Sequence, residues 1–364
     1  AACPGARVYT LAVRWNPAKN GLQGGRVSRD VPEPKQVVRP LLRWYARARR
    51  DLPWRGSRDP YRVWVSEIML QQTQVERVRD YFARFTARFP DVGSLAIARE
   101  SDVLKLWEGL GYYRRARQLH AAAREVVAEH GGTFPRTVED LRRLPGIGRY
   151  TAGAIASIAF GVRAPIVEAN SRRVLARLVG HAAPVGGAAG DGPLWEIAER
   201  LVPAREPGLF NQALMDLGAG VCTPDKPLCH RCPLAGVCVA RRTDRVTEIP
   251  APAPRKAATI VRETAIIERR AGKVLVVRRG PGEWWEGLWD FPRAARPPRG
   301  RRLGTVAYTV THHKVTCTVV ERESRGRAPR PTANRRWVTP GGLTRLALSA
   351  PGRRIATLLA SSVP

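Results

Sequence analysis

Four cysteines give this chain of 364 residues its most distinctive chemical pattern. Cys222, Cys229, Cys232 and Cys238 follow the spacing C-x6-C-x2-C-x5-C. Thiols clustered in this way are typical of a metal centre in a reducing compartment rather than of a secreted disulfide framework. Structural zinc sites usually pair two C-x-x-C units, and this loop has only one. Four thiolates in a compact loop also suit an iron–sulfur cluster, so both metals are candidates.

Two acidic residues lie in apolar stretches where carboxylates are unusual. Glu67 lies within VWVSEIML, and Glu168 ends the small apolar run that begins after LPGIG. Two carboxylates with different pKa values can break a glycosidic bond, because one donates a proton while the other stabilises a sugar cation. Burial beside Trp64 and Ile68 would raise the pKa of Glu67 as acid catalysis requires. The alternative is a helix carboxylate paired with an arginine such as Arg62.

A glycine-containing turn, Leu144-Pro145-Gly146-Ile147-Gly148, lies between two helix-like segments. Its two glycines permit backbone conformations that other residues avoid. The turn would present amide N–H groups at a helix N-terminus, where an anion is favoured. We therefore expect Gly146 and Gly148 to bind a phosphate, and such contacts position a protein on DNA without reading its sequence.

The charge of the chain also indicates a polyanionic partner. There are 62 basic and 31 acidic residues, which gives a formal net charge of +31. Nucleic acid is the simplest partner for such a chain. Part of the excess follows from an arginine-rich composition of the kind that GC-rich coding sequence produces. No apolar run approaches the length of a membrane span.

Periodicity divides the chain into four parts. Residues 1–33 have no clear pattern and are expected to be a disordered extension. In residues 34–242 apolar side chains recur every three or four residues, as they do in amphipathic helices, and this part includes the cysteine loop at 222–238. Residues 243–258 are rich in proline and are expected to be a linker. Residues 259–364 contain segments in which apolar and polar residues alternate, and other segments of consecutive β-branched residues. Both patterns predict strands, and therefore a smaller domain that contains a sheet.

Several segments resemble the MutY branch of the helix-hairpin-helix DNA glycosylases. They are LPWR, PYRVWVSEIMLQQTQV and LWEGLGYYRRARQLH, together with the hairpin, the acid in PIVEAN and the cysteine spacing. GPGEWWEGLWDFP resembles the C-terminal Nudix-like domain of that family, although the clustered carboxylates of the Nudix hydrolase box are missing. The resemblance implies a mainly α glycosylase domain with a [4Fe–4S] cluster loop, followed by an α+β Nudix-like domain that recognises a lesion without hydrolysing nucleotides.

The resemblance also implies roles for the two carboxylates and their neighbours. Glu67 would protonate the departing adenine, and Glu168 would stabilise the oxocarbenium ion. Asn170 would position water or the sugar. The family pattern is Asp-Gly-Asn, whereas this chain has Glu168-Ala169-Asn170. Strand-cleaving relatives carry a lysine at the position of Tyr150, and a tyrosine cannot form the imine that their chemistry needs.

Further contacts are carried over from the same family. In its glycosylase domain Gln71, Gln72 and Tyr112 would contact or wedge into the duplex, and Trp54, Arg55 and Gln212 would line the adenine pocket. In the Nudix-like domain Thr311 and His312 would read 8-oxoguanine. Each has a plainer interpretation: QQTQ as a solvated helix face, Tyr112 as a packed aromatic side chain, and His312 as a polar loop residue.

The sequence thus predicts a monofunctional enzyme that removes adenine opposite 8-oxoguanine or guanine in duplex DNA. We expect a monomer without membrane association, in the bacterial cytoplasm with the nucleoid, or in the nucleus or mitochondrion of a eukaryote. One alternative is an endonuclease III-like or thymine-mismatch glycosylase. Another is a catalytically impaired protein that binds damaged DNA, because Glu168 departs from the family pattern.

Overall fold

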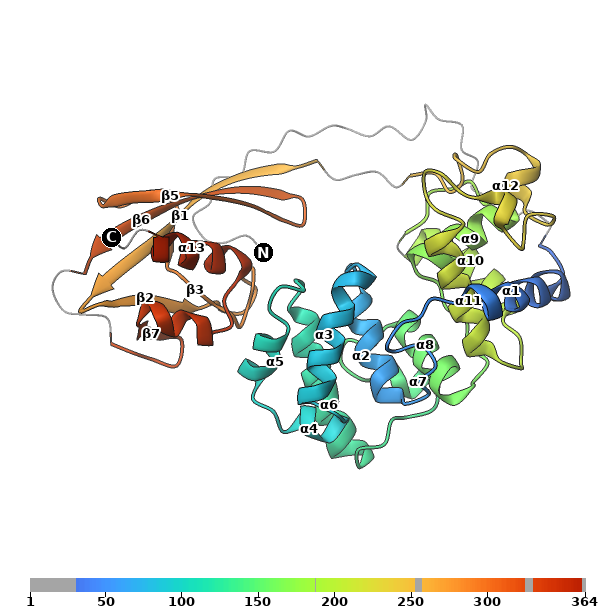
Figure 1. Cartoon of the computed structure of the whole chain (residues 1–364), viewed down its shortest axis with the longest axis horizontal. Coiled ribbons are helices and arrows are strands. Elements are labelled where there is room, and N and C mark those ends of the chain that lie inside the picture. The colour runs from blue at the N-terminus through green and yellow to red at the C-terminus, as the bar shows by residue number, and fades with distance from the viewer. Residues whose placement is uncertain (1–30, 187, 253–256, 325–329, 362–364) are drawn as a thin grey trace. The chain divides into compact units, whose positions relative to one another are not determined.

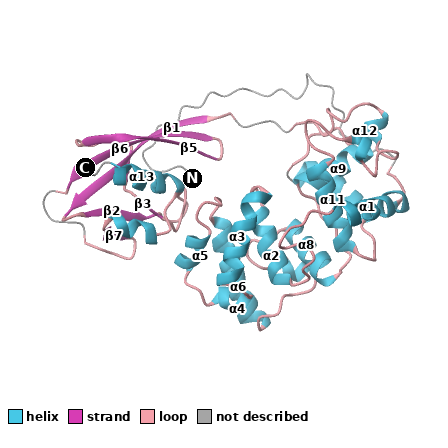
Figure 2. Cartoon of the chain, in the orientation of Figure 1, coloured by secondary structure: helices cyan, strands magenta, loops and turns pink. Residues whose placement is uncertain are grey.

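The structure is a computed structural model that describes residues 31–186, 188–252, 257–324 and 330–361. Its described residues form two compact units. The helical unit contains residues 31–96 and 121–252, and the mixed unit contains residues 97–120 together with the described residues after 256 (Figure 1). Most of the predicted 1–33 extension lies outside the described residues. Figure 2 shows that the described strands all belong to the mixed unit.

The helical unit is built from short and medium helices, as the periodicity predicts. Most expose one polar face, whereas α2, α8 and α11 are buried nearly all round. Its helices are α1 (Pro34–Ala48), α2 (Pro60–Leu70), α3 (Val75–Arg88), α4 (Val92–Ala96), α7 (Val138–Leu141), α8 (Arg149–Phe160), α9 (Ala169–Val179), α10 (Ala188–Leu201), α11 (Pro207–Gly220), the 3-10 turn η2 (Cys229–Arg231) and α12 (Val239–Arg242).

The glycine turn forms the predicted hairpin between α7 and α8. Gly146 has a φ of +77°, which a residue with a side chain rarely adopts, and the amide of Ile147 donates to the Leu144 carbonyl at 3.2 Å. Gly148 is the N-cap residue of α8. The hairpin therefore ends where the unpaired amides of α8 begin, as an anion site requires.

One apolar core joins α1, α9, α10 and α11. Leu41, Leu175 and Leu217 are fully buried in it, and the cysteine loop packs against its edge. Ile249 also lies in this core with 1% exposure, and the amide of Ala251 donates to the Ala182 carbonyl. The expected linker at 243–258 therefore begins later than its composition suggests, because one isoleucine fixes its first part to the helical unit.

The mixed unit carries a twisted sheet and several short helical elements. The sheet order is β3-β2-β1-β6-β5, with β1 and β6 parallel and the other pairs antiparallel. The elements are α5 (Glu100–Leu106), β1 (Thr259–Arg270), β2 (Lys273–Arg278), β3 (Trp289–Asp290), β4 (Arg293–Ala294), β5 (Arg301–Val310), β6 (His313–Glu323), β7 (Arg335–Val338), η3 (Pro340–Arg345) and α13 (Ala350–Ser361). Helix α6 (Arg114–His130) begins in this unit and continues into the helical one.

The core of the mixed unit lies between the sheet and α13. Ile267 and Val319 from the strands, and Phe291 between β3 and β4, pack with Ile355 and Leu359 from α13. Strands β5 and β6 are joined by the two residues Thr311 and His312, since Val310 pairs with His313. Thr311 has a φ of +53°, as tight two-residue hairpins often require.

We predict that Gly218→Ala destabilises the helical unit while Gly220→Ala does not. A Cβ on Gly218 would lie 2.6 Å from Cβ of Asn170 and 2.8 Å from its carbonyl oxygen, so α11 would have to move away from α9. Such overpacking costs about 1–3 kcal/mol. Gly220, on the same helix, has no neighbour within 4 Å of the added carbon. Thermal or urea unfolding measures the difference, and equal stability of the two variants would contradict this close approach.

Candidate active site

Glu67 lies on α2 with only 4% of its surface exposed. The hydroxyl of Tyr150, from the first turn of α8, donates a hydrogen bond to Oε2 of Glu67. Arg62, the partner that the alternative interpretation required, instead stacks over the Phe82 ring at 5.0 Å. The structure therefore joins Glu67 to Tyr150, two residues that the sequence analysis treated separately.

Burial raises the pKa of the Glu67 carboxyl. The Tyr150 hydrogen bond and the positive charge of Arg55 oppose this rise, while the negative charge of Glu168 adds to it. Burial also raises the pKa of the Tyr150 phenol well above its usual value, so Tyr150 stays protonated and remains a donor. A carboxyl that holds its proton more tightly than an exposed one can deliver that proton to a leaving group.

Glu168 is the N-cap residue of α9, and its side chain turns back onto its own helix. Its Oε2 accepts from the amide of Asn170 and its Oε1 from the amide of Ser171, both at 2.8 Å. The Ser171 hydroxyl accepts in return from the Glu168 amide at 2.9 Å, which completes a capping box. Two bonds use about half of the lone-pair sites of a carboxylate, so Glu168 can still face a developing cation.

The side chain of Asn170 is oriented by Arg173, one turn along α9. Nη2 of Arg173 donates to Oδ1 of Asn170 at 2.9 Å and to the Gly218 carbonyl at 2.8 Å. Its Nε donates to the Cys222 carbonyl at 2.7 Å. Because Oδ1 faces the guanidinium, the amide nitrogen of Asn170 is the group left to meet a substrate. Arg173 thus ties the candidate site to the start of the cysteine loop.

The cysteine loop is held by a second arginine of α9. Arg177 is 3% exposed, and its Nη1 donates to Sγ of Cys222 at 3.4 Å and to the Thr223 carbonyl at 2.7 Å. A buried guanidinium beside the sulfur suits an anionic metal–thiolate group.

The four cysteines of the loop are half-buried free thiols. The pKa of Cys232 is raised to about 12, first by burial and then by the charges of the other three cysteines, while a backbone hydrogen bond from Leu234 opposes the rise. Within the described ranges no three His, Cys, Asp or Glu side chains converge as they would around a single metal ion.

The residues expected in the base pocket are only partly brought together. Arg55 and Gln212 line a cavity of about 420 Å³ in the helical unit. Gln212 accepts from the Tyr45 hydroxyl at 2.8 Å, and Arg55 pairs with the buried Asp216 at 3.0 Å. Trp54 is buried and packs edge-to-face on Phe82 instead, so its role here is to fix the loop that carries Arg55.

The residues expected to contact DNA lie at ends of helices. Gln71 caps α2, and its amide nitrogen donates to the Thr151 hydroxyl on α8 at 3.4 Å. Gln72 is exposed, with a φ of +56°. Gly146 and Gly148 form the hairpin at the start of α8. These four residues therefore flank the two helices that carry Glu67 and Tyr150.

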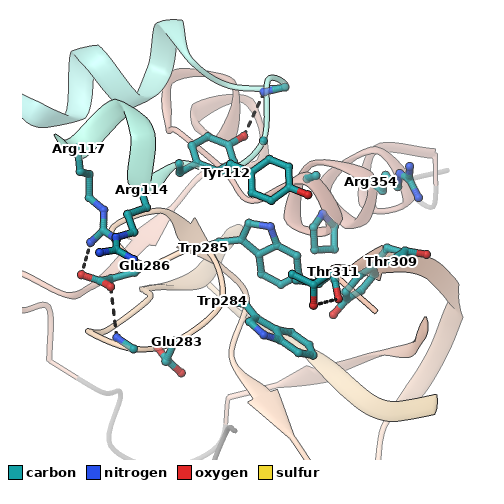
Figure 3. Close-up of a pocket in the computed structure, with 18 residues that line it drawn as sticks. Tyr112, Arg114, Arg117, Glu283, Trp284, Trp285, Glu286, Thr309, Thr311 and Arg354 are labelled. Carbon is teal, nitrogen blue, oxygen red and sulfur yellow. Dashed lines mark hydrogen bonds and ion pairs between the residues drawn. The ribbon is translucent and has the colours of Figure 1, made fainter. Parts of the chain in front are cut away.

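A second cavity, of about 540 Å³, lies in the mixed unit. Figure 3 shows Tyr112, Trp285 and Thr311 around it, with Arg114 and Arg354 at its sides. Thr311, the residue expected to read the lesion, therefore lines this cavity. His312 is not part of the lining; its ring stacks on His313 with centroids 4.1 Å apart.

The aromatic floor of this cavity rests on a buried ionic network. Trp285, with a φ of +59°, packs edge-to-face on Tyr308 at 5.3 Å. The Tyr308 hydroxyl donates to Glu263, whose carboxylate also pairs with Arg293 at 2.8 Å. Arg293 in turn makes two 2.9 Å bonds to the fully buried Asp290. These carboxylates therefore serve to fix Tyr308 and, through it, Trp285.

Sequence reasoning missed Arg173, Arg177 and Trp285. The two arginines are spaced by four on α9, so they share the helix face that meets the cysteine loop. That spacing was readable in the sequence, although nothing local indicated that this face would meet the loop. The aromatic pair in GPGEWWEGLWDFP carried a signal for Trp285, but it did not indicate which ring would face the cavity.

We predict that Glu67→Gln stabilises the protein increasingly as the pH rises. The folded pKa of Glu67 lies above the ordinary value of 4.5, so between these two values the folded chain binds more protons than the unfolded chain. Wild-type stability therefore falls with pH in that window, by up to about 1.4 kcal/mol per pH unit. The glutamine still accepts from Tyr150 and has no charge to bury.

Unfolding midpoints measured from pH 4 to pH 8 test this linkage. Glu199→Gln, which removes a half-exposed carboxylate on α10, is the matched control for the loss of one carboxylate elsewhere in the helical unit. A difference between Glu67→Gln and wild type that stays constant across this range would contradict the raised pKa.

Two family models match the chain in the order of its two expected domains. Residues 65–184 match the model described as HhH-GPD superfamily base excision DNA repair protein, and residues 263–358 match the NUDIX domain model. This agrees with the predicted fold class. In the described residues no helix is both long and apolar enough to span a membrane.

Similar proteins cover much of the chain. The human adenine DNA glycosylase is 42% identical over 84% of this chain, and the match spans 58% of the human protein. The rat and mouse enzymes are likewise matched over little more than half of their length. The adenine DNA glycosylase of Buchnera aphidicola subsp. Schizaphis graminum is 36% identical, and the match covers 73% of that protein.

A solved structure supports the helical fold. A thermostable thymine-DNA glycosylase is 34% identical, with a TM-score of 0.51, over 58% of this chain and 97% of that one. The Buchnera relative, which the chain covers over 73% of its length, and the two family models show that the chain belongs to the adenine DNA glycosylase family of the HhH-GPD superfamily, with a C-terminal Nudix-like domain.

Proposed function

We propose that the chain hydrolyses the N-glycosidic bond of adenine opposite 8-oxoguanine or guanine in duplex DNA. The observation that carries this proposal is the buried carboxyl of Glu67, whose raised pKa suits a proton donor, held by Tyr150 and near Glu168. Relatives along most of the chain are named adenine DNA glycosylases. The target base would have to leave the helical stack to reach a carboxyl so well buried.

The reaction divides between the two carboxylates. Glu67 protonates the adenine ring, so that the base leaves as a neutral group. Glu168 faces the sugar and stabilises the positive charge that develops as the bond breaks. Asn170, held by Arg173, presents its amide nitrogen to the sugar or to the attacking water. Water then adds to the sugar cation and gives its proton to the Glu67 carboxylate, which leaves an abasic site and restores the acid.

The enzyme is proposed to stop at that abasic site. Strand cleavage by this superfamily's lyase chemistry needs an amine that forms an imine with the sugar, and Tyr150 offers only a phenol. In the helical unit the phenol already donates to Glu67. Lys105 is the only lysine between positions 36 and 225, and its amine pairs with Glu108 in the mixed unit. The role of Tyr150 is therefore to hydrogen-bond Glu67 and not to attack the sugar.

Recognition of DNA is assigned to both units. Gln71, Gln72 and the amides after Gly146 and Gly148 hold the strands near the target. The cavity of the mixed unit reads the opposing base, with Trp285 as a flat apolar surface and Thr311 as the hydroxyl group, whose O–H turns from the Val310 carbonyl to donate to the base. His312 lies beside it and meets the DNA from the same hairpin. We propose that the chain acts as a monomer in the compartment that contains the DNA, which is the nucleoid of a bacterium or the nucleus or mitochondrion of a eukaryote.

Adenine release tests this function directly. Duplexes with one 8-oxoguanine:adenine, guanine:adenine or thymine:guanine pair are incubated with wild type, Glu168→Asp and Glu168→Gln. We expect wild type and Glu168→Asp to release free adenine and to leave the strand intact until alkali is added. Glu168→Gln should lose activity by at least about a hundredfold, because the charge opposite the sugar cation is gone.

Other results of this assay would support a different function for the chain. Release of thymine from the thymine:guanine duplex would favour a thymine-mismatch glycosylase, and tight binding without any release would favour a damage-binding protein. Efficient trapping of wild type by borohydride would show an imine and reject the monofunctional assignment.

We propose that Cys222, Cys229, Cys232 and Cys238 hold a [4Fe–4S] cluster. Four half-buried thiols in one loop, with the Arg177 guanidinium against one sulfur, suit this anionic group. When bound, the cluster fixes the loop to the end of α9 and takes no part in breaking the glycosidic bond. Arg173 and Arg177 then hold the loop against the helix that carries Asn170.

We predict that protein purified without oxygen is brown and contains about four iron atoms per chain. Arg177→Ala should lose iron faster than wild type on exposure to air, because it lacks the hydrogen bond to Cys222. Arg163→Ala, which removes an ion pair with Glu199 and hydrogen bonds to the Val202 and Glu199 carbonyls, is the control for the loss of an arginine outside α9. A colourless, active protein with one zinc per chain would contradict the cluster.

A further inference from the structure

The loop between α5 and α6 holds Tyr112 in a fixed and exposed position. Gly109, Gly111 and Tyr112 have φ values of +103°, +75° and +46°. The indole nitrogen of Trp107 donates to the Gly111 carbonyl at 3.1 Å, and Nη2 of Arg115 donates to the same oxygen at 3.1 Å. Tyr112 nevertheless remains 51% exposed. A tyrosine held outward on a left-handed backbone indicates a functional constraint rather than a packing role.

This loop is anchored to α13 by one ion pair. Nε of Arg353 donates to Oε1 of Glu108 at 2.7 Å, and its Nη2 donates to Oε2 at 3.0 Å. The other donors of Arg353 bind the carbonyls of Leu343 and Leu346 at 3.0 and 2.9 Å. Lys105 completes the group by donating to Glu108 at 2.8 Å and to the Leu346 carbonyl at 3.1 Å.

The geometry of this pair makes it stronger than a typical surface ion pair. Exposed pairs often contribute nothing measurable, because two mobile side chains must be ordered. Here the Glu108 and Arg353 side chains are 17% and 32% exposed, and the contact is bidentate. Backbone carbonyls already fix the arginine, so little further ordering is needed. Glu108 is also only four residues from Tyr112, within the same hydrogen-bonded loop.

Two more ion pairs attach the same segment to the sheet side of the mixed unit. Glu100, at the start of α5, pairs with Arg278 at 2.8 Å. Arg117, in the first turn of α6, pairs with Glu286, next to Trp285 (Figure 3). The segment that carries Tyr112 is therefore held before, within and after its loop by residues of the Nudix-like domain.

We propose that Glu108 and Arg353 are positioning residues that set Tyr112 against the cavity that reads the opposing base. The inference rests on the proposed function, in which Tyr112 wedges beside 8-oxoguanine. It gives the Nudix-like domain a second role, because this domain both reads the base and fixes the wedge that stands next to that base. Lesion preference then depends on an ion pair that does not line the cavity and is not expected to touch the DNA.

Single-turnover adenine release by the full-length chain tests this proposal. The measured quantity is the ratio of rates on 8-oxoguanine:adenine and guanine:adenine duplexes. Arg353→Ala and Glu108→Gln should each lower the ratio about fivefold, the scale expected for one ordered pair, and the double variant should be no worse than either single one. Arg353→Lys keeps the charge and loses the bidentate contact, so its rate ratio should lie between those of wild type and Arg353→Ala. Arg301→Ala, which breaks an ion pair on the sheet, should match wild type.

Tyr112→Ala separates positioning from general loss of structure. If the pair acts through Tyr112, then Arg353→Ala or Glu108→Gln should change the ratio no further in the Tyr112→Ala background. The proposal would be overturned if either substitution lowered the rate ratio further in the Tyr112→Ala background. It would also be overturned if the single variants Arg353→Ala and Glu108→Gln kept the wild-type ratio. Should Arg353→Ala unfold at assay temperature, the nearly isosteric Glu108→Gln decides alone. Failure of wild type to release adenine from either duplex would instead reject the proposed function.

Discussion

The burial of one carboxyl, that of Glu67, is the constraint around which the helical unit is organised. Taking an ionisable group out of water raises its pKa and disfavours its charged form. Such a group must be hydrogen-bonded, and α8 supplies the Tyr150 hydroxyl for this purpose. The hairpin before α8 fixes where that helix begins, and therefore where Tyr150 stands. The turn proposed to bind phosphate and the proposed acid are thus set by the same element.

Helix α9 connects the second carboxylate with the cysteine loop. Its N-cap is Glu168, its first turn carries Asn170, and Arg173 and Arg177 follow on one face. Arg173 reaches Asn170 and the Cys222 carbonyl, while Arg177 reaches Cys222 Sγ. A metal group in that loop would consequently stiffen the helix that holds Asn170, without needing any chemical part in the reaction. The close approach of Gly218 keeps α11 tight against this helix.

Patterns that depend on local spacing predicted the fold well. Periodicity separated helices from strands, and the hairpin glycines, the cysteine spacing and the family resemblance gave the fold class that the family models confirm. Contacts between distant segments were beyond such reasoning. Nothing local indicates that Ile249 packs in the helical core, or that residues 97–120 of the glycosylase sequence form one compact unit with the Nudix-like domain. The capping role of Glu168 was also unforeseen, since it depends on how a longer side chain folds back.

Catalysis by a protonated Glu67 is the central claim, and the pH dependence of adenine release measures the protonation state of this residue. Single-turnover rates on an 8-oxoguanine:adenine duplex are recorded at pH values from 4 to 9. The account predicts a level rate at acidic pH that falls tenfold per pH unit above an apparent pKa higher than the ordinary 4.5 of a glutamate. A rate that instead rises with pH through this range would mean that the carboxylate form is the active one, and would contradict the assignment of Glu67 as the acid.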